Sequence, residues 1–283
     1  MPNIQAIHRT RHAQQRWHSA PSYAFAATDG VVALVAQELP KALLSLPIAF
    51  IAAEGSYLPV AVQNFKTGQN LFVAADGRWI GSYVPSAYRG YPFMLGQDST
   101  GKQALCVDED SGFVCAADDK TALAALAKTK ATPEPFFGED GEPTKKILDI
   151  FEFLNQVAKN RVDTQRLCTV LQKHALIEPW PVKVQGDSGE QNVDGLFRIS
   201  EAALNQLPTD AFMELRSTGA LLVAYCQLLS VQQLPMLAKL AQAHAQAAAQ
   251  IAKQTKPLVK PSGDLDLEFL NNNGTISFGN LFK

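Results

Sequence analysis

Three tyrosines, one arginine and two prolines lie within the thirteen residues YVPSAYRGYPFML, Tyr83 to Leu95, of a chain with only 8% aromatic residues. Tyr and Arg side chains combine flat faces with polar tips, so such a cluster can stack on a ligand and hydrogen-bond to it. The same residues could instead form a corner where a strand turns and its rings fill a core. Composition alone does not separate these two possibilities.

The side chains of this cluster divide into two groups. We expect Trp79 and Phe93 to anchor the core, and Tyr88, Arg89 and Tyr91 to form a recognition surface. An arginine between tyrosines and next to proline can present a carboxylate-binding or stacking face to a peptide. The full set of candidate binding residues is Tyr83, Tyr88, Arg89, Tyr91, Arg78 and Asp108.

Acidic residues form a second cluster in the run DEDSGF, Asp108 to Phe113. Carboxylates near a turn could bind a hard cation, but the run lacks the alternating carboxylates and the twelfth-position Glu of an EF-hand loop. A solvated turn is therefore favoured over a metal site. Asp108 shares strand register with Cys106, so its carboxylate could point inward and pair with Arg89 or Arg78.

Catalytic motifs are not evident in the chain. It has no G-x-S-x-G elbow, no P-loop and no strand-bounded G-x-G-x-x-G, and the GDSG of Gly186 to Gly189 lacks the His and Asp contexts of a serine protease. We therefore predict a protein without catalysis. The alternative is an enzyme of unknown reaction, such as peptide modification, whose groups Asp76, Asp108 and His174 meet only in the folded chain.

Composition excludes several other classes. The 283 residues are 47% hydrophobic, enough for a sizeable core, and a net charge of -2 argues against nucleic acid as a partner. The four cysteines form no C-x-x-C pair and the five histidines no H-x-x-x-H motif, so we predict no metal or cofactor and expect reduced thiols.

The N-terminus is polar and basic without an apolar core, so no secretory signal is predicted and a cytoplasmic location is expected. The uncharged segment 217–238 is long enough to cross a bilayer. It contains three glutamines and Pro235, which would be costly in hydrocarbon. We therefore predict a buried helix and no membrane span.

Short apolar runs separated by Gly, Pro and Asp, such as PIAFIAA and NLFVAA, predict a mainly antiparallel sheet over 23–115, with a hairpin turn at Asp76 and Gly77. Pro143 is placed to occupy a first helical turn, and apolar residues recurring from Ile147 to Leu171 predict one long amphipathic helix or two abutting ones. Downstream we expect a hairpin around Gly186 to Gly189, a helix capped by Ser200 and a helical block interrupted near Pro235.

These elements predict an α+β protein, with a β-rich N-terminal half packed against a helical C-terminal half and a terminal hairpin. The expected divisions are an arm (1–22), a β-rich core (23–120), a linker (121–142), a mainly helical part (143–256) and a C-terminal tail (257–283). The Ala-rich helix near the end could also mediate self-association, so a homo-oligomer is a further candidate state.

The ordered series GQNLFVAADGRWIGSYVPSAYRGYPFML, Gly68 to Leu95, followed by LCVDEDSGF resembles the SapC family of bacterial proteins. YAFA, PIAFIA, TQRLCTVLQKHALIEPW and VDGLFRIS extend the resemblance, more loosely, from about Tyr23 to Gln233. The family often has a second arginine after Arg89, where this chain has Gly90. That departure puts a charge-pair role at position 90 in doubt.

The family takes its name from a surface-layer-associated protein, so the resemblance implies a cell-envelope or surface-layer context. An unrelated peptide-transporter permease shares the name, but it would need several membrane spans. We therefore expect an accessory protein that recognises a peptide or protein of the envelope. Surface association is implied by the resemblance alone.

Overall fold

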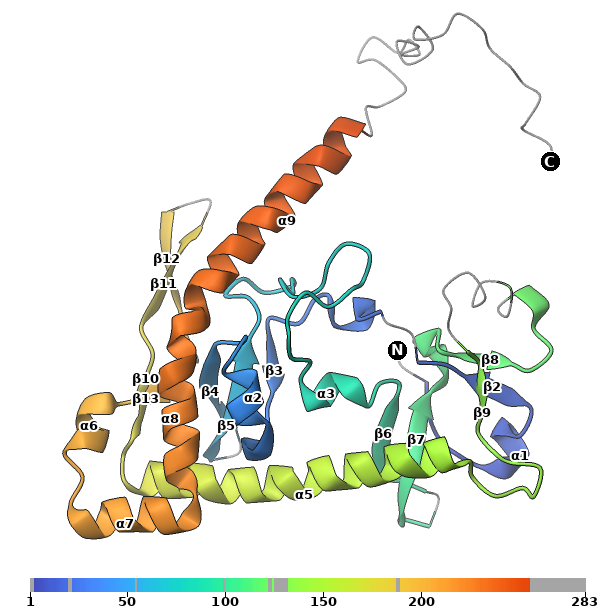
Figure 1. Ribbon diagram of the computed structural model, residues 1–283, viewed down its shortest axis with the longest axis horizontal. Helices are drawn as coiled ribbons and strands as arrows, with labels where there is room; N and C mark the ends of the chain where they lie inside the picture. The colour runs from blue at the N-terminus through green and yellow to red at the C-terminus, as the bar shows by residue number, and fades with distance from the viewer. Residues whose placement is uncertain are drawn as a thin grey trace, which may run out of the picture. The chain divides into compact units, whose positions relative to one another are not determined.

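The structure is a computed structural model that describes residues 3–19, 22–53, 55–98, 100–121, 124, 132–186 and 189–254. It is an α+β fold, as predicted, with antiparallel sheets in the N-terminal half and helices in the C-terminal half (Figure 1). The chain divides into two compact units, 1–238 and 239–283. The sheets and all helices up to α8 lie in the first unit.

A five-stranded antiparallel sheet forms the centre of the first unit. Its order is β10 (Ile177–Pro179), β13 (Phe197–Ile199), β4 (Ile48–Ala53), β5 (Ser56–Val62) and β3 (Val31–Ala33). The hairpin β4–β5 carries the apolar run predicted as a strand, and Phe50 at its centre is fully buried. Strand β3 pairs with β5 alone, so one edge of the sheet is β3.

Two three-stranded sheets contain the N-terminal residues that we expected to form an arm. In one, β1 (Ile4–Ala6) pairs with β7 (Gln103–Asp108), which also pairs with β6 (Phe93–Gln97). In the other, β2 (Gln15–Trp17) lies between β8 (Val114–Ala116) and β9 (Glu134–Pro135). The helical turn α1 (Arg9–His12) connects β1 to β2. Residues 4–17 are therefore part of the sheet structure.

One long helix, α5 (Lys145–Lys173), runs along both sheet regions and contacts β5 and β6 (Figure 1). The sequence left open one long helix or two abutting ones here, and the structure has one. Its N-cap is Thr144, so the expectation that Pro143 lies in the first turn is wrong by two positions. The buried face carries Ile147, Cys168 and Leu171 together with two polar residues, Asn160 and Thr164.

The polar residues on that face are hydrogen-bonded to the segment after β3. Thr164 Oγ1 accepts the N–H of Ala36 at 2.7 Å, and Asn160 Nδ2 donates to Gln37 at 2.7 Å. These residues belong to the 3-10 turn η2 (Ala36–Glu38), which continues into α2 (Leu39–Ala42). Helix α5 thus holds η2 through directed bonds, in agreement with the rule that buried polar groups are paired.

The helical C-terminal part consists of α6 (Glu201–Asn205), α7 (Thr209–Thr218), α8 (Ala220–Ser230), the turn η4 (Val231–Gln233) and α9 (Leu234–Gln254). Ser200 is the N-cap of α6, as predicted, but its side chain makes no capping bond. The expected helical block is broken at Gly219, where φ is +90°, and again at η4 just before Pro235. A left-handed residue ends a helix most easily as glycine.

The uncharged segment 217–238 contains the end of α7, all of α8 and η4, and the start of α9. Gln227 and Ser230 are buried and hydrogen-bond to the backbones of Ile48 and Ile199. In the described chain one helical stretch, Ala220–Gln250, meets the length and hydropathy of a membrane span, and 39% of its most apolar window is buried.

Three further local predictions have different outcomes. The hairpin of β11 (Val182–Gly186) and β12 (Gly189–Val193) is confirmed, and so is the turn at Asp76 and Gly77. The run NLFVAA is not a strand, since it contributes only a single bridge from Val73 to Trp79. The predicted C-terminal hairpin in 257–283 lies outside the described residues.

A buried histidine lies where α1 meets the sheets. His12 is fully buried, its ring is tilted against that of Phe136 with centres 5.2 Å apart, and its Nδ1 accepts the N–H of His8. Its Nε2 lies 3.3 Å from Glu109 Oε1 but makes no hydrogen bond to a described residue. Burial lowers the pKa of His12, and it also lowers the pKa of His18.

These histidines predict a loss of stability in mild acid. Below the unfolded pKa of about 6.5, the unfolded chain binds protons that folded His12 and His18 resist, so stability falls as pH falls. Each histidine can contribute up to about 1.4 kcal/mol per pH unit there. Urea unfolding at pH 7.5 and 5.5 measures this, and His12→Gln should show a smaller difference than wild type. An equal difference in both proteins would contradict the assignment.

Candidate functional site

The aromatic segment 83–93 is attached to the rest of the protein through a buried carboxylate, Glu38. This side chain is 4% exposed and accepts four hydrogen bonds of 2.8 Å. The donors are the N–H of Val35, the hydroxyl of Tyr83, and both the N–H and the hydroxyl of Ser86. A carboxylate is an acceptor only, so four donors satisfy it without a paired cation.

Tyr83 connects this buried carboxylate to the surface. Its hydroxyl donates to Glu38 and accepts from Arg89 Nη2 at 3.3 Å, while its backbone carbonyl accepts from Trp79 Nε1 at 2.9 Å. Burial, followed by the bond to Glu38, raises the pKa of Tyr83 well above its ordinary value. The hydroxyl therefore keeps its proton at neutral pH and holds the ring in place.

Arg89 lies on a platform made of two aromatic rings. Its guanidinium carbon is 5.8 Å from the ring centre of Tyr83 and 5.1 Å from that of Phe153 on α5. Arg89 is exposed at the end of the short helix α3 (Ser86–Arg89) and makes no ion pair with any described carboxylate. We call these three residues, Tyr83, Arg89 and Phe153, the Arg89 platform.

Tyr88 is not part of a surface, contrary to our expectation. It is 6% exposed, and its hydroxyl lies 2.9 Å from both Asp29 and Gln63. One hydroxyl carries one proton, and the charged oxygen of Asp29 is the stronger acceptor. Burial, then the charge of Asp29, raises the pKa of Tyr88 far above its ordinary value. Tyr88 therefore anchors α3 to the end of β5.

Tyr91 belongs to a row of rings that continues through the interior. It stacks on Phe25 with ring centres 3.9 Å apart and contacts Phe113 edge-on at 5.5 Å. Tyr91 is half-buried, and both of these ring contacts are internal to the protein. Rings in contact one after another form the row His18, Phe113, Tyr91, Phe25, Tyr88, Trp79 and Phe72, and Tyr23 contacts both Phe25 and Trp79.

The two expected core anchors also belong to this interior. Phe93 is 5% exposed and packs edge-on against Trp17 at 4.9 Å, so its predicted place in the core is confirmed. Trp79 is half-buried between Phe72 and Tyr88. Gly90 faces α5, because a Cβ there would lie 2.6 Å from Leu154. A second arginine after Arg89 would therefore have to displace Leu154.

The remaining candidate binding residues have partners of their own. Arg78 is exposed and pairs with Asp76 at 2.6 Å within the turn, so it lies outside the Arg89 platform. Asp108 does point inward, at 6% exposure, but it accepts the N–H groups of Asn3 and Asp110. The suggestion that Asp108 pairs with Arg89 or Arg78 is therefore wrong.

The residues named for an enzyme do not meet. Asp76 pairs with Arg78, Asp108 caps the turn after β7, and His174 lies 2.9 Å from Glu214 on α7. Burial raises the pKa of all four free cysteines, to about 12 for Cys168 and about 11 for Cys226, so none is an activated thiolate. Among the described residues no group of three or more His, Cys, Asp or Glu is placed to hold a metal ion.

Sequence reasoning missed the three residues that organise this region, Glu38, Asp29 and Phe153. Each comes from a segment distant in sequence, and none lies in a recognisable motif. Glu38 carried one weak signal: it is a lone acid between the apolar runs VVALVA and LPKALL. An isolated acid in such a setting is buried only if donors converge on it.

Taken together, the fold and the site define an α+β protein in which an aromatic segment, attached through two carboxylates, presents one arginine on two rings. The sequence model of the SapC family matches residues 7–237, and the chain belongs to this family. Searches of curated proteins and of solved structures found no match. The expected resemblance to SapC is thus confirmed over most of the chain.

The Glu38 contacts predict a large effect from a small change. In Glu38→Gln one carboxylate oxygen becomes an NH₂ group, which cannot accept the two hydrogen bonds that this oxygen accepted. The loss of these buried bonds should lower the free energy of unfolding by about 2–4 kcal/mol. Tyr83→Phe removes one donor only and should cost about 1 kcal/mol. Urea unfolding tests both, with Glu178→Gln at an exposed ion pair as control. A loss below 1 kcal/mol in Glu38→Gln would contradict this account.

Proposed function

We propose that the protein is an accessory protein that binds a peptide or protein of the cell envelope, without catalysis, through the Arg89 platform. The observation that carries this proposal is the state of Arg89: exposed, supported by the rings of Tyr83 and Phe153, and without an ion pair to any described carboxylate. A guanidinium that lies over aromatic rings can keep its outer N–H groups free for a carboxylate.

The chemistry of the partner follows from the same geometry. Within the described residues, one guanidinium donor of Arg89 is used, in the bond to the hydroxyl of Tyr83. The other N–H groups suit bidentate binding of a carboxylate, from an acidic side chain or a free C-terminus. The envelope context is supported by the name of the SapC family, and surface association is part of the proposal for the same reason.

The test compares two exposed arginines of one segment, Arg89 and Arg78. Random peptides displayed on phage are selected on the full-length protein, and enriched peptides are measured by fluorescence anisotropy. We expect enrichment of acidic or free C-terminal carboxylates, with Arg89→Gln weakening binding roughly 10- to 100-fold. Arg78→Gln should change binding less than about twofold, because Arg78 already pairs with Asp76.

Two results would count against the proposal. One is a set of enriched peptides without carboxylates, and the other is an equal effect of the two substitutions. Thermal melts of both variants should match wild type, since both side chains are exposed. Amidation of the peptide C-terminus distinguishes a terminal carboxylate from an acidic side chain.

A further inference from the structure

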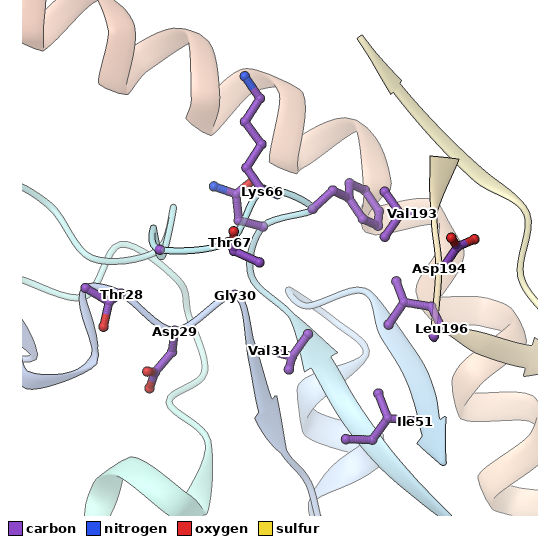
Figure 2. Close-up of a pocket in the computed structure, with 14 residues that line it drawn as sticks. Thr28, Asp29, Gly30, Val31, Ile51, Lys66, Thr67, Val193, Asp194 and Leu196 are labelled. Atoms are coloured by element: carbon purple, nitrogen blue, oxygen red, sulfur yellow. The ribbon is translucent and has the colours of Figure 1, made fainter. Parts of the chain in front are cut away.

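A cavity of about 500 Å³ lies at the end of the five-stranded sheet, away from the Arg89 platform. It is lined by the start of β3, by Ile51 of β4, and by the loops 64–68 and 193–196 (Figure 2). None of Tyr83, Arg89 and Phe153 lines it. Its volume is in the range of pockets that enclose small ligands.

The centre of this cavity is apolar. In the paired strands Val31 lies opposite Val62, and Ile51 lies opposite Leu58. Leu58 and Val62 point to the same face of β5 because side chains alternate along a strand. Val31 and Ile51 therefore lie on one face of the sheet. Most of both faces is covered, since Val32 and Phe50 on the other face and Val60 and Val62 on this face are buried. On the cavity face Val31 is 38% exposed and Ile51 is half-buried.

Side chains from the two loops complete the apolar wall. Leu196 lies across from Val31 and Ile51 in Figure 2, and the wall also includes Phe65 and Val193. An apolar surface that is concave and only half covered gains free energy when a hydrophobic group enters it. The ligand must therefore carry an apolar group.

The charges around the cavity disfavour a strongly charged ligand. Lys66 and Asp194 are exposed and of opposite sign, and their ends point away from Val31 and Leu196 in Figure 2. The carboxylate of Asp29 already accepts the hydroxyl of Tyr88. The lining thus carries two carboxylates and one ammonium group, which disfavours an anionic ligand, and a neutral group is best for the part of the ligand outside the apolar centre.

Two glycine turns border the cavity. Gly68 and Gly195 have φ of +83° and +84°, and nothing lies within 4 Å of where a Cβ would be. The space beside each Cα is therefore open, so the backbone there can be approached by a neutral ligand that both donates and accepts hydrogen bonds. A peptide backbone has that property at every residue.

We infer that this cavity binds an apolar side chain of leucine or phenylalanine size, presented by a peptide backbone. The inference rests on the proposed peptide-binding function and adds a second, hydrophobic subsite to it. The Arg89 platform would then bind a carboxylate of the partner, and this cavity would bind one of the partner's apolar side chains. The two sites share no residue, so each can be tested without the other.

The experiment is a methyl NMR titration of the full-length protein with N-acetyl-leucinamide, N-acetyl-phenylalaninamide and N-acetyl-alaninamide. The methyl signals of Val31, Ile51 and Leu196 should shift saturably with the first two compounds. The alanine compound should bind at least about 10-fold more weakly, because it buries fewer methylenes. Equal shifts with all three, or none, would overturn the inference.

Matched variants separate this cavity from other surfaces. Val31→Trp should fill the cavity and abolish the shifts, whereas Leu44→Trp, at a residue 68% exposed and outside the cavity, should leave them unchanged. If Val31→Trp does not fold, Thr67→Trp at the exposed mouth replaces it. Wild-type binding by either cavity variant would overturn the inference.

Two further measurements identify which proposal fails. Arg89→Gln should bind the neutral leucine compound as wild type does. If the proposal for the Arg89 platform is wrong, the binding of this compound to the cavity should therefore be unaffected. Decanoate serves as a probe for a simple acyl chain. Shifts of the same methyl groups with decanoate, and none with the leucine and phenylalanine compounds, would replace the peptide by a fatty acyl ligand and overturn the inference.

Discussion

The carboxylate of Glu38 is the constraint on which the candidate site depends. A buried charge is tolerated only when hydrogen bonds replace its hydration, and here four donors from two segments do so. Satisfying Glu38 requires Tyr83 and Ser86 to lie beside η2. That in turn places α3 next to α5, where Arg89 meets Phe153.

A second carboxylate, Asp29, holds the same segment through Tyr88, two residues beyond Ser86. With Tyr83, Ser86 and Tyr88 attached in this way, the rings of Tyr88 and Tyr91 join the row from His18 to Phe72. This explains the density of aromatic residues in Tyr83 to Leu95. Most of the rings connect the sheet regions, and the arginine that follows Tyr88 is left at the surface.

Features governed by local pattern were predictable. The spacing of apolar residues from Ile147 to Leu171 predicted the helical structure of α5, and the turn residues located Asp76–Gly77 and the β11–β12 hairpin. The same reasoning failed for NLFVAA, whose residues Leu71, Phe72 and Val73 are buried by tertiary contacts without a strand. A short apolar run is expected both in a strand and in a buried segment that is not a strand, so the sequence pattern does not distinguish the two.

The sequence by itself determined the α+β class, the main helix, the tight turns and the SapC family, because each depends on neighbouring residues or on an ordered series of them. Only the tertiary structure decided which tyrosine is buried. Tyr83 bonds to a residue 45 positions away and Tyr88 to one 59 positions away. Contacts at such separations leave no local periodicity, so the roles of Tyr88, Arg89 and Asp108 follow from packing.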